Sequence, residues 1–193
     1  HWPIPVENNA RVLTPDDIMA GAKAEGRVVI FDDDHYYMGG VLAELLRHQG
    51  HDVTLITPAA DVSNWTHNTL EQRRIQSRLM TMGVNILPLH TITEVETDCV
   101  TVECIYTEAE RDIPCDTFIP VTMRRPVDDL YSAAVTAFAD RADAPTLTRI
   151  GDCLAPGTIA AAVYSGHRYA RELGEPASDA VPFRRELPAL ATD

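Results

Sequence analysis

The sequence has few basic residues and no long apolar run, and both absences exclude a class of protein. Only 16 of its 193 residues are Lys or Arg, against 29 Asp or Glu, which gives a net charge of −13. Nucleic acid and anionic membrane surfaces repel a chain this acidic. No apolar run approaches the roughly 18 residues that a membrane span needs, and the N-terminus has no signal pattern. We therefore expect a cytoplasmic protein without nucleic-acid or membrane partners.

The cysteines and histidines lack the spacings of metal and catalytic sites. No CxxC pair joins the cysteines, so the sequence encodes neither a zinc site nor an iron–sulfur cluster. No Ser–His–Asp arrangement or metal-ligand spacing joins the histidines. The sequence thus predicts reduced thiols, no metal ligand and no catalytic residue on this chain. The residues concerned are Cys99, Cys104, Cys115, Cys153, His51, His67, His90 and His167.

Glycine is missing where a dinucleotide-binding turn needs it. Residues 27–57 have the strand, turn, helix and strand pattern of a nucleotide-binding fold. Residues 32–34 of the turn are all aspartate, and the first glycines, Gly39 and Gly40, come late. Glycines let the backbone approach a pyrophosphate at the helix N-terminus. Three carboxylates repel it instead, by roughly 1 kcal/mol per close pair in water. We therefore expect this turn not to bind NAD(H) productively.

The remaining pattern predicts an α/β fold. A parallel sheet with right-handed crossovers is expected from alternating elements with short connections. These are strands 28–31, 52–57 and 84–88 and helices 39–49 and 68–82, the last with Leu70, Ile75, Leu79 and Met82 as its inward stripe. Short alternating segments then predict an antiparallel β-meander with strands 93–95, 100–106 and 118–121.

The two ends of the chain have other patterns. A short helix over 15–21 has Thr14 as N-cap and Pro15 at its first position. A helix at 127–139 is followed by a strand over 148–152 that ends in Gly-Asp, and then by a helix over 158–173. The tail after Gly174 has no periodicity and is expected to be extended or disordered.

Four segments together resemble a known family. They are VLTPDD at 12–17, DDDHYYM at 32–38, WTHNTLE at 65–71 and RIGDCLAPGT at 149–158. They are similar to the C-terminal nucleotide-binding portion of the trimethylamine and dimethylamine dehydrogenase branch of the NADH:flavin oxidoreductases, the old-yellow-enzyme-like family. The resemblance implies the architecture of two-dinucleotide-domain flavoproteins: a Rossmann-like NAD-type domain with a β-meander, plus the C-terminal piece of an FAD-type domain.

The resemblance also divides the chain into four parts. It implies an N-terminal arm and linker over 1–26, a degenerate NAD-type domain over 27–146, an FAD/ADP-type segment over 147–174 and a tail over 175–193. Members of the family also carry a TIM barrel with FMN and a 4Fe-4S cluster, which this chain lacks. The implied function is that of a subunit or fragment of a flavin-dependent amine dehydrogenase or N-demethylase, in a hetero-oligomer with that barrel. The alternative is a non-catalytic module that stabilises the assembly.

The site residues implied by the resemblance lie near the last helix. In such flavoproteins the aspartate of the late Gly-Asp pair binds the flavin ribityl chain, and the next helix N-terminus faces the cofactor. This maps onto Gly151, Asp152, Gly157 and Thr158, which would bind FAD or ADP together with a partner segment. The alternative is that Asp152 only caps the last helix.

One more cluster has two interpretations. His35 lies beside two tyrosines at the predicted turn, and such a group could transfer protons. At a strand-to-helix turn, packing against a neighbouring domain is the commoner outcome, and we expect packing here. Trp65 is expected to anchor the loop before the second helix.

Overall fold

The chain divides into two compact units. The structure is a computed structural model that describes residues 4–174. One unit ends at Met123, and the other begins at Arg124. This division falls earlier in the chain than the predicted boundary at residue 146, and the assignment of the parts to NAD-type and FAD-type domains stays a prediction. The predicted tail 175–193 lies outside the described residues.

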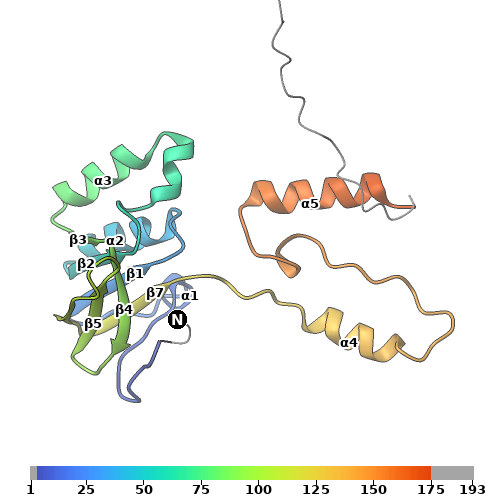
Figure 1. Ribbon diagram of the computed structural model, residues 1–193, viewed down its shortest axis with the longest axis horizontal. Coiled ribbons are helices and arrows are strands. Elements are labelled where there is room, and N and C mark those ends of the chain that lie inside the picture. Colours follow the sequence, from blue (N-terminus) through green and yellow to red (C-terminus); the bar gives the residue numbers. More distant parts are fainter. Residues whose placement is uncertain (1–3, 175–193) are drawn as a thin grey trace, which may run out of the picture. The chain divides into compact units, whose positions relative to one another are not determined.

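A four-stranded parallel sheet forms the centre of the first unit (Figure 1). Its strand order is β3-β2-β1-β7. The flanking helices α2 and α3 follow β1 and precede β3, as expected of parallel strands with crossovers. The bounds are β1 Arg27–Asp32, α2 Met38–His48, β2 Asp52–Thr57, α3 Gln72–Thr81, β3 Asn85–Pro88 and β7 Thr117–Val121.

Each face of this sheet buries its own apolar cluster. Val28 and Ile30 of β1 pack with residues of α2 and α3, including Leu42 and Leu79. The alternate residues of β1, Val29 and Phe31, lie in a second cluster with residues of the antiparallel sheet. Because successive side chains of a strand point to opposite faces, β1 is buried on both sides. That explains why its sequence is an unbroken apolar run.

The antiparallel sheet differs from the predicted meander in its third strand. Its order is β4-β5-β6, with bounds β4 His90–Val95, β5 Cys99–Cys104 and β6 Glu110–Pro114. The predicted third meander strand, 118–121, was assigned to the wrong sheet: it is β7, whose Phe118 pairs in parallel with Val29 of β1. The true third strand, β6, begins with charged residues and gave no apolar signal.

The predicted helix over 68–82 is wrong in its first turn. A 3₁₀ helix, η1 over Asn64–Thr69, comes first, and α3 begins only at Gln72. Leu70 separates the two with a left-handed φ of 62° and is 93% exposed. Its predicted place on the inward stripe is therefore also wrong, whereas Leu79 of that stripe is buried.

The described part of the second unit, residues 124–174, contains two helices and a 3₁₀ turn. The bounds are α4 Asp129–Phe138, η2 Gly151–Cys153 and α5 Ile159–Glu172. The predicted strand over 148–152 is wrong, because the described part of this unit offers no strand to pair with it. Arg149 instead forms an ion pair with Asp128 and lies 4.8 Å from the centre of the Tyr131 ring.

The N-terminal arm is tied to the first unit. The predicted short helix is α1, Pro15–Met19, and Thr14 and Asp17 form a capping box at its start. Val12 forms a bridge to Phe118 of β7. Within residues 4–174, no helix has the length and apolar character needed to cross a membrane.

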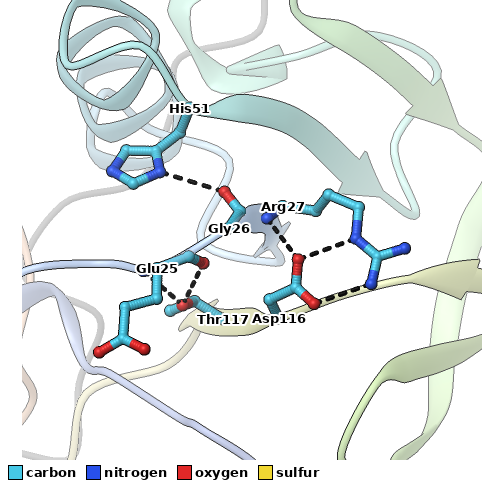
Figure 2. A network of polar contacts seen from close by, with 6 residues as sticks. All are labelled: Glu25, Gly26, Arg27, His51, Asp116 and Thr117. Atoms are coloured by element: carbon cyan, nitrogen blue, oxygen red, sulfur yellow. Dashed lines mark hydrogen bonds and ion pairs between the residues drawn. The ribbon is translucent and has the colours of Figure 1, made fainter.

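A polar clamp joins the amino ends of β1 and β7 (Figure 2). The Asp116 carboxylate accepts hydrogen bonds from the backbone N–H and the guanidinium of Arg27, at 2.7 to 2.8 Å. The His51 ring nitrogen Nδ1 lies 3.1 Å from the Gly26 carbonyl oxygen. The Arg27 guanidinium holds the pKa of Asp116 well below its usual range. This clamp lies at the opposite strand ends from the β1–α2 turn.

Candidate functional site

The β1–α2 turn is the first candidate, because ligands of parallel α/β folds lie at the carboxyl ends of the strands. Asp32, the last residue of β1, is fully buried at 0% exposure. Its Oδ1 accepts a hydrogen bond from the His35 backbone N–H at 3.0 Å. Its Oδ2 has no hydrogen-bond partner among the described residues. Burial raises the pKa of this carboxyl group to about 6, because desolvation disfavours the charged form.

Two glycines bring the first turn of α2 close to buried oxygen atoms. A Cβ on Gly39 would lie 2.7 Å from Asp32 Cγ and Oδ2. A Cβ on Gly40 would lie 3.3 Å from Ser63 Oγ, another buried atom without a hydrogen-bond partner among the described residues. Tyr37, the N-cap of α2, makes no side-chain capping bond. The Asp32 carboxyl group thus lies against the helix N-terminus, where a dinucleotide turn holds its phosphate.

The His–Tyr–Tyr segment packs within its own unit. The Tyr36 ring stacks on Trp65 with 4.6 Å between ring centres, and the Trp65 backbone N–H donates to the His35 carbonyl at 3.0 Å. Packing was the predicted outcome, and Trp65 of the same unit is one partner, whereas packing against a neighbouring domain stays a prediction. Trp65 also anchors the loop, as predicted. The Tyr37 hydroxyl donates a hydrogen bond to Glu71.

His35 is held in a conformation that is unusual for a residue with a side chain. Its φ is +62°, in the left-handed region. Its ring nitrogen Nε2 lies 3.4 Å from Asp33 Oδ1, and Nδ1 lies 3.5 Å from Thr57 Oγ1. This strain could not be predicted from the sequence, since nothing local requires His at a left-handed position.

A small cavity of about 180 Å³ lies between α2 and α3. Its apolar lining comes from Val41, Ile75 and Leu79. Two arginines and two glutamates also line it, and the Arg78 guanidinium forms a bidentate pair with Glu44. The formal charges cancel, so the cavity carries no clear preference for a cation or an anion.

The second candidate is the loop that precedes α5. Gly151 has a φ of +60° and its N–H donates to Ser165 Oγ at 3.0 Å. Asp152 Oδ1 accepts from the Gly157 N–H at 3.3 Å. Thr158 is the N-cap of α5, and its Oγ1 accepts from the Ala161 N–H. The structure therefore brings all four predicted residues into one loop. Ser165 was missed, because it lies in the middle of a helix.

The geometry also separates the two predicted roles of Asp152. Thr158, and not Asp152, caps α5, since Asp152 bonds a residue that precedes the helix. Asp152 is exposed, and the Gly157 N–H is its only hydrogen-bond donor among the described residues, at the long end of the usual range. Its carboxylate can therefore accept a hydrogen bond from a hydroxyl group of a ligand.

A group of Glu96, Asp98 and Cys99 at the β4–β5 turn is the one cluster of metal-ligand type within residues 4–174. The Cys99 thiol donates to the Glu96 carboxylate at 2.7 Å, and this bond raises the thiol pKa to about 12. Both carboxylates are exposed. The group has the character of a solvated turn.

Comparison with known proteins gives a consistent set of relatives. Residues 13–114 match the family described as OYE-like second alpha/beta domain. Dimethylamine dehydrogenase of Hyphomicrobium sp. (strain x) is 33% identical over 217 residues, which cover 100% of this chain and 29% of the relative. The structure of histamine dehydrogenase from Rhizobium sp. 4-9 matches with a TM-score of 0.90 and 43% identity, over 100% of this chain and 31% of that one.

A second solved structure is also similar. It is the 6-hydroxypseudooxynicotine amine oxidase of Pseudomonas geniculata N1, with a TM-score of 0.81 and 35% identity, over 90% of this chain and 26% of that one. The chain thus spans less than a third of the length of these relatives.

Proposed function

The chain belongs to the family of OYE-like second alpha/beta domains, and from that premise we propose that it is the corresponding part of a flavin-dependent amine dehydrogenase or N-demethylase. In this proposal it is a subunit or a fragment of the enzyme and supplies part of a nucleotide-binding module. The substrate is a methylated amine or a related N-methyl compound.

One observation carries the proposal. Three amine-oxidising relatives align with 90 to 100% of this chain at 33 to 43% identity. The matches to dimethylamine dehydrogenase and histamine dehydrogenase cover the whole chain, and so span both the acidic β1–α2 turn and the Gly-Asp loop before α5.

The proposed nucleotide is FAD or ADP, bound by this chain and a partner segment together. Gly151, Asp152, Gly157 and Thr158 would hold it. The exposed carboxylate of Asp152 supports this role, since it can accept hydrogen bonds from ribityl or ribose hydroxyls. The nearby N-terminus of α5 supplies backbone N–H groups that favour an anion. FMN and the 4Fe-4S cluster, which supply the redox chemistry of the family, belong in this proposal to the catalytic portion and not to this chain.

The proposed partner is a flavin and iron–sulfur TIM barrel, as a separate subunit or as another part of the same polypeptide. The second unit supports a partner, because none of its described residues is buried. Ile159 of α5 is 85% exposed and Val163 is 55% exposed. Large exposed apolar surfaces are usually interaction sites.

The competing proposal is a module that only stabilises the assembly. The β1–α2 turn supports it, because the Asp32 carboxyl group lies where a cofactor phosphate would lie. The two proposals differ at Asp152, which binds a nucleotide in the first and only orders its loop in the second.

The test is purification of the native protein that contains this chain, followed by intact mass analysis and chromatography of the released nucleotides. The proposal expects an FMN and iron–sulfur barrel in the same particle, released FAD or ADP, and oxidation of a methylated amine with an artificial acceptor. A particle with no flavin barrel would refute it.

Substitution of Asp152 separates the two proposals. Asp152→Ala in the whole complex should weaken retention of FAD or ADP by about ten- to a hundredfold, because each charged hydrogen bond contributes roughly 1.5–3 kcal/mol and 1.4 kcal/mol is one decade. The FMN content should not change. Asp140→Ala, at an exposed position of the same unit, is the matched control. If Asp152→Ala lowers only thermal stability, the assembly module is the better description.

A further inference from the structure

The surroundings of Asp32 are suited to a neutral carboxylic acid. The side chain is 0% exposed, and Oδ2 has no hydrogen-bond partner among the described residues. The close approach of Gly39, whose Cβ would lie 2.7 Å from Asp32 Oδ2, leaves no space for water between the carboxyl group and the helix. An ionised carboxylate needs hydrogen bonds to most of its lone pairs, so ionisation of Asp32 favours a conformation that admits water.

The segment that covers Asp32 is strained and short. His35 donates its N–H to Asp32 Oδ1 while its own backbone has a left-handed φ of +62°. The backbone N–H groups of Asp33 and Asp34 both donate to the Val121 carbonyl at the end of β7. The segment that covers Asp32 is therefore held by few hydrogen bonds, and one of them is made to the Asp32 carboxyl group itself.

We propose that residues 33–37 form a pH-sensitive switch, which closes over Asp32 while this side chain is a neutral acid and loosens when it ionises.

The charged groups around Asp32 all come from its own turn. His35 favours ionisation through its N–H and its ring, and the Asp34 backbone N–H also favours it, whereas the Asp34 carboxylate opposes it. The first turn of α2, from Met38 to Val41, contributes no charged side chain, and β7 ends there at Val121. Ser63, which precedes η1, contributes only a hydroxyl group. Among the described residues, no charged side chain on another element stabilises the ionised form. The N-terminus of α2 favours it, but burial has the larger effect on the pKa.

Burial is the largest cause that raises the pKa of Asp32, which reaches about 6. Since a raised folded pKa means that the closed form binds the proton more tightly, closure is favoured below pH 6 and loosening above it. The change thus falls within two pH units of neutrality, in contrast to that of an ordinary aspartate.

The turn contains its own reporter. Trp65 donates its backbone N–H to the His35 carbonyl and stacks on the Tyr36 ring. Loosening of the segment separates these groups and exposes Trp65 further. The other tryptophan of the sequence is Trp2, so Trp2→Phe in the full chain leaves Trp65 as the single fluorophore.

The experiment follows Trp65 emission and its quenching by acrylamide in the full 193-residue Trp2→Phe chain between pH 4.5 and 8. We expect one transition with a midpoint near pH 6 and greater quenching above it. Asp32→Asn, which keeps the shape but cannot ionise, should give a flat profile. His35→Gln should keep the transition, because in this proposal the transition follows the Asp32 carboxyl group.

A flat profile of the parent chain would overturn the proposal, as would a transition that survives Asp32→Asn. So would a transition lost in His35→Gln but retained in Asp32→Asn. If Asp32→Asn does not fold, carboxyl carbon NMR of the parent chain replaces it. The resonance of Asp32 should then titrate together with Trp65 emission, and an ordinary aspartate midpoint near pH 4 would contradict the switch.

Discussion

Substitution of Gly26 by Ala tests the polar clamp at the amino ends of β1 and β7. Gly26 has a left-handed φ of +57° and lies directly against Asp116. An added Cβ would lie 2.7 Å from Asp116 Cβ and Cγ and closer still to Oδ2 (Figure 2). The Asp116 side chain cannot simply rotate away, because its carboxylate bonds both the backbone and the guanidinium of Arg27.

The expected loss of stability has two parts. A left-handed conformation costs an L-residue roughly 1–2 kcal/mol. Overpacking adds typically about 1–3 kcal/mol, since either the clamp or the strand end must shift. Gly26→Ala should therefore lower the free energy of unfolding by about 2–5 kcal/mol.

Gly50→Ala is the matched control. Gly50 also has a positive φ, of +91°, but an added Cβ would meet no atom within 4 Å. Its backbone cost is at least as large as that of Gly26, so any excess loss at Gly26 measures the contact with Asp116. Urea unfolding of the full chain, followed by far-UV circular dichroism, gives both values. Equal losses for the two variants would refute the role of the clamp.

Three further predictions concern the turn and the loop beside it. Asp32→Asn should remove a pH-dependent loss of stability of about 3 kcal/mol. The pKa of Asp32 is about 6 in the folded chain against an ordinary 3.8, so its contribution to stability is complete below pH 3.8 and is lost as the pH rises through 6. Urea unfolding at pH 4 and pH 7.5 measures this loss. Titration of the chain with NADH should show no saturable binding at millimolar ligand, and a micromolar dissociation constant would contradict our interpretation of the turn. Leu70→Asn should raise the free energy of unfolding by up to about 1 kcal/mol, because Asn tolerates the left-handed conformation better than Leu; a loss of 2 kcal/mol or more in urea unfolding would place Leu70 in the core after all.

Hydrophobic periodicity predicted those elements whose burial is decided locally. The strands β1 and β2 are buried on both faces, and α2 has one continuous apolar stripe, so each apolar pattern fits only one type of element. The partner of a strand is a different matter. Nothing within 118–121 distinguishes a meander strand from an edge of the parallel sheet, because the choice depends on which distant strand offers its backbone groups.

The wrongly predicted strand in the second unit also shows that strand formation depends on a distant partner. Residues 148–150 have the composition of a strand, but a strand needs a neighbour to pair its backbone N–H and C=O groups. Arg149 bonds instead to Asp128 and packs on Tyr131, both from the α4 region. The four predicted site residues still meet in one loop, since they are close in sequence and their proximity needs no distant partner.

The β1–α2 turn was correctly located, but its aspartates were treated as equivalent. The structure shows that they differ in burial. Asp33 keeps a partly exposed carboxylate beside His35, whereas Asp32 is buried beneath α2. Gly39 was interpreted as a glycine too late to admit a phosphate. Its position nevertheless meets the same physical requirement as in a dinucleotide turn, namely an absent Cβ at the helix N-terminus. Here the group that approaches through this space is the chain's own carboxyl group, at 2.7 Å from where the Cβ would lie. The absent Cβ of Gly39 thus lets an internal acid lie next to the N-terminus of α2, the place that a dinucleotide turn gives to a phosphate.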